Sequence, residues 1–287
     1  MTLELSPPKQ SVIGFPVTAL PFNTQIHVIL NWADRRISKM VCIANVHMLM
    51  EAHSNPQFAA VLDHADLVTP DGMPLVWLMN LLGVRRQDRV AGMDVLLALC
   101  RQISQQHTDP IRVFFLGSER AILDRIRSRL AQEFPNLAIA GMEPLPFRPL
   151  SPEEDALLIQ RINDSGAGLV FVSLGCPKQE IWMSQHKDKI QAVMLGLGGV
   201  FPVYAGIQKW APAWIRHMGL EWFYRLLQEP RRLWKRYLTT IPPFVYLALK
   251  QLLKQLWIEH FHKGMDQQER ELVAIAQKQP SATPHQH

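Results

Sequence analysis

The stretch LVFVSLGCPKQEIWMSQHK, residues 169–187, decides the fold class of this 287-residue chain. It opens with the nearly continuous apolar run 169–174, passes through a glycine and a proline, and continues as a helical pattern over 177–187. A strand that is apolar on both sides is expected where helices cover both faces of a parallel sheet. The stretch therefore predicts a buried parallel strand that leads through a glycine loop into a helix.

The same alternation of short β-rich runs and longer helical patterns fills the chain up to about residue 196. The run Ser151-Pro152-Glu153-Glu154 is a strong helix start, because serine caps, proline suits the first helical position and a glutamate follows three residues after the cap. The other predicted strands are 11–17, 40–44, 67–69, 111–116, 137–141 and 193–197, and the other predicted helices are 24–35, 73–82, 94–106, 119–133 and 152–163. Strands alternating with helices predict an α/β fold with a Rossmann-like open, mostly parallel sheet and helices on both faces.

The C-terminal third of the chain has a different rhythm. From residue 212 to residue 262 the pattern is helical, with breaks expected at Pro230 and at Pro242-Pro243. We therefore expect three parts: an α/β core over 1–200, a helical appendage over 201–264 and a flexible tail over 265–287.

Basic charge is concentrated in the appendage. The chain as a whole carries a formal charge of +5, but residues 205–263 contain ten basic side chains and three acidic ones, so the rest is close to neutral. Five of the eight tryptophans lie in the same stretch. This pattern indicates attraction to phosphate, either of a ligand or of an anionic membrane surface. A solvated helical face with tryptophans in the core is the alternative interpretation.

Composition excludes several classes of protein. Hydrophobic residues make up 48% and charged residues 19%, which excludes a disordered chain. The cysteines Cys42, Cys100 and Cys176 are widely separated, so we expect a reducing compartment and no structural zinc site. The longest apolar run, 241–249, falls well short of a membrane span, and no basic start with an apolar run opens the chain. A cytoplasmic protein is the default expectation.

Polar side chains follow two of the predicted strands. Asn45 and His47 come after strand 40–44, and Asp71 comes after strand 67–69, at the strand ends where open α/β sheets bind ligands. Asp71 could be a helix N-cap, or a general base whose pKa is raised by its apolar neighbours. Asn45 could likewise be a cap, and His47 a structural histidine.

Glycine loops follow other strands, and their backbone N–H groups could bind phosphate at helix N-termini. Gly196-Leu197-Gly198 begins like the dinucleotide fingerprint, but Phe201 occupies the last glycine position. The sequence has no GxxxxGK[ST], no HExxH and no Asp-x-Asp pair. We therefore expect no metal and no cofactor, with phosphate neutralised by arginines and helix dipoles.

Two other classes of function remain open at this point. The α/β architecture alone suggests a nicotinamide oxidoreductase, although the broken glycine fingerprint disfavours it. The basic, tryptophan-rich end suggests a non-catalytic membrane-associated or nucleic-acid-binding module. That second interpretation leaves Asp71 and the glycine loops without a use.

Several motifs, in order over about residues 10–240, resemble the WecG/TagA/CpsF glycosyltransferases, glycosyltransferase family 26. In the core they are ADLVTPDGMP at 65–74, RVAGMD at 89–94, FLGS at 115–118 and GCPKQE at 175–180. In the appendage they are AP at 211–212 with Trp214, GLEWFYRL at 219–226 and EPRR at 229–232.

The resemblance implies an inverting, metal-independent transfer in cell-surface polysaccharide biosynthesis. The donor would be a UDP-sugar of the N-acetylmannosamine or N-acetylmannosaminuronic acid type, and the acceptor a polyprenyl-diphosphate-linked saccharide at the cytoplasmic face of the inner membrane. Another UDP-hexose or uronic acid donor in exopolysaccharide assembly is the alternative. No nucleic-acid partner is expected, and the active form could be a monomer with a closed appendage or a homo-oligomer.

The resemblance also implies roles for individual residues. Asp71 would be the general base, supported by Asn45, with His47 as a possible sugar contact. The donor diphosphate would meet Arg225, Arg232 and either Lys235 or Arg236. The nucleotide or sugar would be bound by Gly92, Asp94, Gly117, Ser118, Gly175, Gln179, Glu180 and Gly198.

One position departs from the family pattern. Relatives often carry a threonine two residues before the asparagine, near the sugar, whereas this chain has Ile43. Either Asn45 or His47 takes over that polar contact, or the donor sugar differs.

Overall fold

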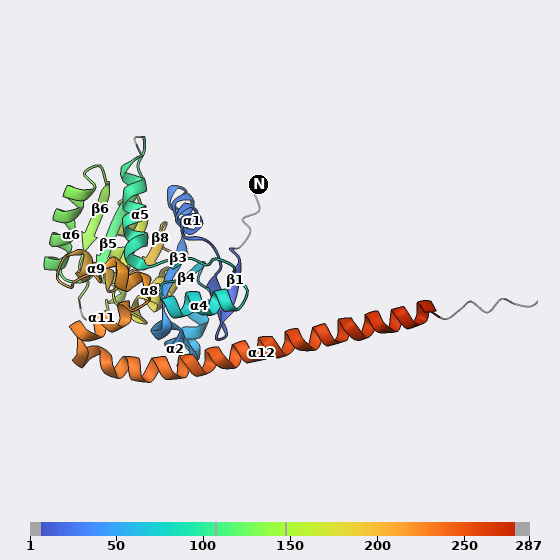
Figure 1. Cartoon of the computed structure of the whole chain (residues 1–287). Helices are drawn as coiled ribbons and strands as arrows, with labels where there is room; N and C mark the ends of the chain where they lie inside the picture. The colour runs from blue at the N-terminus through green and yellow to red at the C-terminus, as the bar shows by residue number, and fades with distance from the viewer. Residues whose placement is uncertain (1–6, 107, 147, 279–287) are drawn as a thin grey trace, which may run out of the picture.

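The computed structural model of the chain describes residues 7–106, 108–146 and 148–278. Its centre is a six-stranded sheet in the order β4-β3-β8-β7-β5-β6, and every neighbouring pair is parallel (Figure 1). The strands are β3 (Lys39–Ala44), β4 (Leu67–Pro70), β5 (Arg112–Gly117), β6 (Ile139–Glu143), β7 (Ala167–Ser173) and β8 (Val193–Gly196). The α/β class and the Rossmann-like parallel sheet predicted from the sequence are confirmed.

Both faces of the sheet are covered, which explains why its strands are apolar throughout. In β7, Leu169 and Phe171 point into one core cluster, and Val170 and Val172 point into the other. The first cluster is completed by α1 (Phe22–Asp34), α5 (Gly92–Ser104), α6 (Arg120–Glu133) and α9 (Val200–Tyr204). The second is completed by α2 (Val46–Ser54), α3 (Pro56–Asp63), α4 (Met73–Leu81), α7 (Pro152–Asp164) and α8 (Lys178–His186).

The prediction of a single N-terminal strand over 11–17 is wrong in one respect. The chain forms a hairpin there, with β1 (Lys9–Val12) antiparallel to β2 (Phe15–Thr18), and this hairpin is a sheet of its own. Its turn residues Ile13 and Gly14 both have positive φ, +47° and +99°. Glycine adopts such a conformation readily, but isoleucine is an unusual turn residue. Because its apolar side chain is typical of a strand, the turn could not be predicted from the sequence.

Two helices between β3 and β4 were not predicted from the sequence, although both have clear start signals. Asn45 caps α2 by accepting a hydrogen bond from the Met48 N–H, and Asn55 caps α3 by accepting from Gln57 and Phe58. These caps place the start of α2 immediately after β3, at the carboxyl edge of the sheet.

The C-terminal appendage consists of α10 (Ala213–His217), α11 (Glu221–Gln228) and the long helix α12 (Pro230–Lys278). Pro230 begins α12, as the expected break implies, but the expected break at Pro242-Pro243 is wrong, because the helix continues through both prolines. The two prolines cannot donate to the carbonyls of Leu238 and Thr239. Those four residues are exposed, so water can bind the carbonyls while Phe244 anchors the helix in the core.

The first part of α12 packs on the core, and the rest of the helix extends away from the core. The first part packs along α2, and Gln251 accepts a hydrogen bond from the Ile13 N–H at 2.7 Å and donates to the Ser11 carbonyl at 2.7 Å. One turn further on, Gln255 donates to the Leu82 carbonyl at 3.4 Å, and after that the helix continues away from the body (Figure 1). Residues 265–278, expected to be flexible, belong to this helix, and 279–287 lie outside the described residues. In the described part of the chain, no helix is both long enough and apolar enough to cross a bilayer.

Candidate active site

Two adjoining cavities lie at the carboxyl ends of β3, β4, β7 and β8, enclosed by the appendage. One is polar, with a volume of about 310 Å³, and the other is an apolar groove of about 390 Å³. Seven residues line both: Asn45, His47, Asp71, Arg89, Glu221, Arg225 and Arg236. The predicted base, two of the predicted cations (Arg225 and Arg236) and the two polar residues that follow β3 therefore meet where the two cavities join.

The polar cavity is built on glycine loops. Gly175, Gly196, Gly198 and Gly199 line it, and Gly198 adopts a positive φ of +43°. A Cβ on Gly198 would lie only 3.0 Å from the Gln179 side-chain oxygen, so the loop has no room for a larger residue. Close backbone approach of this kind lets main-chain N–H groups contact a bound phosphate or sugar.

Gln179 and Glu180 form a buried polar pair behind this loop. Gln179 Nε2 donates to Glu180 Oε1 at 2.7 Å, and burial raises the pKa of the Glu180 carboxyl. Gln179 Oε1 and Glu180 Oε2 have no hydrogen-bond partner within the described part of the chain. A buried polar group is normally satisfied, so these two oxygens are exceptions within the described part of the chain.

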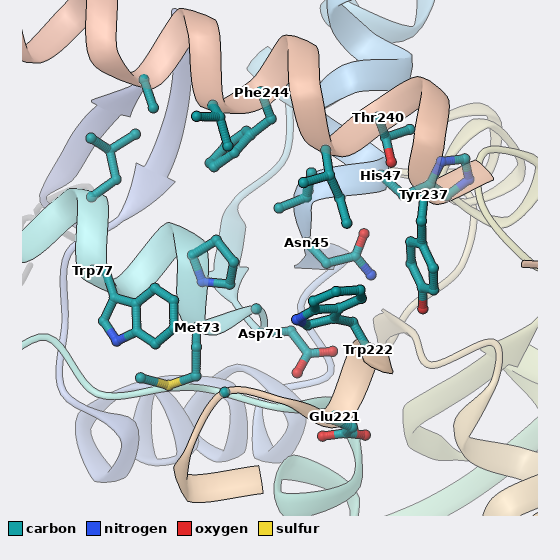
Figure 2. A pocket seen from close by; sticks show the side chains of 18 of the residues that line it. Asn45, His47, Asp71, Met73, Trp77, Glu221, Trp222, Tyr237, Thr240 and Phe244 are labelled. Atoms are coloured by element: carbon teal, nitrogen blue, oxygen red, sulfur yellow. The ribbon is translucent and has the colours of Figure 1, made fainter. Parts of the chain in front are cut away.

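Asp71 is the central residue of the site. It follows β4 directly, and its backbone N–H donates to the Ala44 carbonyl at 2.8 Å, which fixes it beside the end of β3. Gly72, not Asp71, is the N-cap of α4, and no side chain caps that helix. The N-cap interpretation of Asp71 is therefore wrong, and its carboxylate points into the cavities instead, with 31% of the side chain exposed there (Figure 2).

The surroundings of Asp71 shift the pKa of its carboxyl. Burial between core and appendage raises the pKa of its carboxyl to about 7. Arg89 and Arg225 oppose this rise, and Glu221 and Asp94 add to it. A base is most effective when its pKa lies near the working pH, so Asp71 is suited to take a proton at neutral pH.

Asn45 is the N-cap of α2, and His47 lies in the first turn of that helix. The Asn45 side-chain oxygen caps that helix at 3.2 Å from the Met48 nitrogen, so the structural interpretation of Asn45 holds, and the residue also lines both cavities. Burial, together with the positive charge of Arg236, lowers the pKa of His47 to about 4. His47 is therefore neutral at physiological pH and can take part in hydrogen bonding without adding charge.

The predicted cations do not all reach the site. Arg225 and Arg236 line both cavities, and Arg232 lines the polar one and pairs with Glu229. Arg225 extends to the glycine loop, where its Nη2 lies 3.0 Å from the position of a Cβ on Gly199. Lys235 lines neither cavity. Of the two alternatives for the third cation, the geometry favours Arg236.

Four predicted ligand residues, Asp94, Gly117, Ser118 and Glu180, lie outside the lining of both cavities. Gly117 and Ser118 end β5 with φ of +89° and +64°, and a Cβ on Gly117 would lie 2.5 Å from the Ser173 carbonyl. These two residues thus make a tight turn against β7. Asp94 pairs with Arg216 of α10 at 3.4 Å and connects core to appendage. Gly92 and Gly175 do line the polar cavity, as expected.

Two charged residues of the site were not predicted as ligands, although both stand in the quoted motifs. Arg89 comes from the loop between α4 and α5, and its Nη2 donates to Glu221 Oε2 of α11 at 3.0 Å. Neither residue follows a strand, so the strand-end rule could not find them. An arginine three residues before the glycine that begins α5 was the available signal.

The apolar groove runs between α4 and α12. Figure 2 shows Tyr237, Thr240 and Phe244 of α12 on one side of it and Met73 and Trp77 of α4 on the other. Its lining also includes Leu81, Trp222, Val245, Ala248, Leu249 and Leu252. Such a wall fits a hydrocarbon chain, and Asp71 is among the residues that line the groove.

A carboxylate with raised pKa, placed between a polar glycine-lined cavity and an apolar groove on a parallel α/β sheet, is the arrangement of a group-transfer enzyme. Comparison with known proteins gives the family. The model of the glycosyl transferase WecG/TagA/CpsF family matches residues 10–257, and the chain belongs to that family. It is a glycosyltransferase.

Two curated relatives cover most of the chain. One, from Bacillus spizizenii, is 34% identical over 225 residues, which is 78% of this chain and 84% of the relative. The other, from Bacillus subtilis, is 31% identical over 222 residues, which is 77% of this chain and 83% of the relative. Both are named N-acetylglucosaminyldiphosphoundecaprenol N-acetyl-beta-D-mannosaminyltransferase.

Proposed function

We propose that this glycosyltransferase moves N-acetylmannosamine, or its uronic acid, from a UDP-sugar onto an N-acetylglucosamine attached to a polyprenyl diphosphate. The observation that carries the proposal is the position of Asp71, where the polar cavity and the apolar groove join. The names of the two Bacillus relatives specify the same transferred sugar and the same kind of lipid-linked acceptor.

The polar cavity suits the nucleotide sugar. Arg225, Arg232 and Arg236 line it, and together they offer positive charge to a diphosphate. Charge that develops on the UDP leaving group would be met by these fixed guanidinium groups and by the glycine-loop N–H groups. A metal ion is not needed for that role, so we propose a metal-independent transfer.

The apolar groove suits the acceptor. A polyprenyl chain is a long hydrocarbon, and the walls of the groove are aromatic and aliphatic side chains of α4 and α12. With the lipid in the groove, its diphosphate and first sugar would lie toward the junction, near Asp71 and Arg89. The acceptor hydroxyl would then face the donor sugar in the polar cavity.

The transfer follows from this placement. The Asp71 carboxylate takes the proton of the acceptor hydroxyl while the oxygen attacks the anomeric carbon and the bond to UDP breaks. Donor and acceptor approach from two cavities that adjoin at Asp71, and we propose that the attack comes from the face opposite UDP and inverts the configuration. A β-linked product, as in the names of the relatives, would result from an α-linked UDP-sugar.

The isoleucine at the family's threonine position lies in the donor cavity. Ile43 lines the polar cavity and is almost fully buried. Because the Asn45 oxygen is already engaged in capping α2, the neutral His47 is the better-placed substitute for a hydroxyl contact. A different UDP-hexose or uronic acid donor stays the alternative to N-acetylmannosamine.

We further propose that α12 docks the enzyme on the cytoplasmic face of the inner membrane. Tyr246, Leu253, Leu256 and Trp257 are exposed along one side of the helix, and the basic Lys250 and Lys254 lie beside them. The opposite side packs on the core through Phe244. An amphipathic helix of this kind fits an anionic bilayer surface and would present the groove to a membrane-held acceptor.

A donor panel tests the proposed function. Each UDP-sugar is incubated with a short-chain polyprenyl-diphosphate-N-acetylglucosamine, and UDP release is followed with and without EDTA. We expect release with UDP-N-acetylmannosamine or its uronic acid, unchanged by EDTA. Release with a different UDP-sugar would favour the alternative donor, and loss of activity in EDTA would contradict the metal-independent step.

A further inference from the structure

The Arg89 guanidinium is shared among carboxylates of three different elements. It donates to Glu221 of α11 at 3.0 Å, while its Nη2 lies 4.0 Å from Asp94 Oδ2 of α5 and its Nε lies 3.8 Å from Asp71 Oδ1. A separation of 3.8 Å is too long for a hydrogen bond. Arg89 is therefore hydrogen-bonded to the appendage, whereas with Asp71 it forms an ion pair without a hydrogen bond.

A second ion pair also connects the core and the appendage, but here the arginine belongs to the appendage and the carboxylate to the core. Arg216 of α10 pairs with Asp94 of the core at 3.4 Å, stacks on the Trp210 ring at 3.9 Å and donates to the Ala211 carbonyl at 3.1 Å. Asp94 is thus held by Arg216. Glu221 is the carboxylate that hydrogen-bonds the Arg89 side chain.

The turn before α11 is shaped to fit this position. Gly219 has a φ of +73°, and a Cβ there would lie 2.9 Å from Met73 Cβ and 2.9 Å from the Trp77 ring. Only glycine allows so close an approach of this turn to α4. The close fit places Glu221, two residues later, beside Arg89.

We propose that Glu221 is a positioning residue that holds the Arg89 guanidinium away from the Asp71 carboxylate, so that the base is available only while α11 is docked on the core. The inference rests on the proposed function, because it concerns the base of that reaction. It links closure of the appendage, which excludes water from the donor, to activation of the acceptor.

The charges around Asp71 give the direction of the effect. Apart from burial, the groups that act on its pKa are Arg89 of the core loop, Glu221 and Arg225 of α11, and Asp94 of α5. Replacing Glu221 by glutamine removes a negative charge and releases Arg89 toward Asp71. Both changes stabilise the carboxylate, so both lower its pKa and weaken it as a base.

The test is the pH profile of kcat for Glu221→Gln. We expect the acidic limb to move about one pH unit or more below that of the wild type, as for a carboxylate that gains a close cation, with a lower plateau. Glu221→Asp keeps the negative charge, so its acidic limb should be displaced less than that of Glu221→Gln. The double variant Glu221→Gln with Arg89→Gln should return the limb toward the wild-type position, because the cation that lowers the pKa is gone.

Arg216→Gln is the matched control, since it breaks the other ion pair between core and appendage. It should raise the KM for the UDP-sugar without lowering the acidic limb. If Glu221→Gln behaves in the same way, Glu221 serves docking alone and the inference is overturned.

A titration of the Asp71 carboxyl by carbon-13 NMR separates the inference from the proposed function. The full-length protein is used, and Asp71→Asn identifies the signal. A lowered pKa in Glu221→Gln supports the inference even if the wild type transfers no sugar, an outcome that would refute only the proposed function. An unchanged or raised pKa would refute the inference.

Discussion

At the scale of single residues, the environment that makes Asp71 basic also destabilises the fold. Its carboxyl has an ordinary pKa of 3.8, and burial raises the pKa to about 7. Between these two pH values the native state binds more protons than the unfolded state, so this residue makes the free energy of unfolding fall as the pH rises. Above about pH 7 the destabilisation is complete.

Asp71→Asn should therefore stabilise the protein at high pH. We expect the variant to melt a few degrees above the wild type at pH 8, and to differ little from it near pH 4, where the native carboxyl is protonated. Thermal unfolding followed by circular dichroism at both pH values measures this. Equal melting temperatures at pH 8 would mean that the carboxylate is not destabilising in the fold.

The pH profile of the wild type gives a second prediction. Because the base must be deprotonated, kcat should fall about tenfold per pH unit below an acidic limb near pH 7. A histidine of ordinary pKa could produce a similar limb, but the pKa of His47 is lowered to about 4. His47→Asn should thus keep the limb near pH 7. A limb that vanishes in this variant would assign the base to His47.

Local rules predicted part of the site at this scale. The strand-end rule placed Asn45, His47 and Asp71 at the junction of the cavities, since parallel strands all end at one edge. It could not separate a cap from a base, because that depends on which way the side chain points. Arg89 and Glu221 reach the site from a loop and from the appendage, which no local pattern indicates.

At the scale of elements, one side of α12 packs on the core and the other carries exposed apolar side chains. Leu253, 66% exposed, lies on the side assigned to the membrane, and it lines neither cavity. Leu253→Glu should reduce flotation with anionic phosphatidylglycerol vesicles several-fold, because it adds charge to the apolar stripe and removes apolar contact. Leu157→Glu on α7, where the leucine is 53% exposed, is the matched control and should float like the wild type.

Equal flotation of Leu253→Glu, Leu157→Glu and the wild type would contradict membrane docking by this side of α12. If Leu253→Glu lowers flotation equally with neutral and with anionic vesicles, the lysines Lys250 and Lys254 contribute little to membrane binding.

The predictability of the elements depended on how they are stabilised. The six parallel strands follow from apolar runs that must be buried, and their predicted ranges agree with the structure to within a few residues. The β1–β2 turn at Ile13 and the continuity of α12 through Pro242 depend on tertiary contacts, which override local propensity.

At the scale of the whole molecule, the apolar groove forms only when α4, which ends at Leu81, and α12, which begins at Pro230, come together. Ala248 of α12 lines it. Ala248→Trp should fill the groove and raise the KM for a polyprenyl acceptor about tenfold or more, the equivalent of about 1.4 kcal/mol of lost contact, with the KM for the UDP-sugar unchanged. Ala156→Trp on the exposed side of α7 is the control.

An acceptor KM that is equal in Ala248→Trp and the wild type would place the lipid elsewhere. The effect should also grow with acceptor length, since longer prenyl chains occupy more of the groove. The presence of such a groove could not be predicted from the sequence, because its two walls belong to separate parts of the chain.

The most direct test of the account compares sugar transfer by the wild type and by Asp71→Asn. Mass spectrometry follows the addition of one N-acetylhexosamine to polyprenyl-diphosphate-N-acetylglucosamine, and calorimetry measures UDP binding by both proteins. Loss of a general base should lower the rate by at least about a hundredfold while UDP binding stays the same. Transfer by Asp71→Asn at the wild-type rate would show that the carboxylate at the junction of the two cavities is not the base.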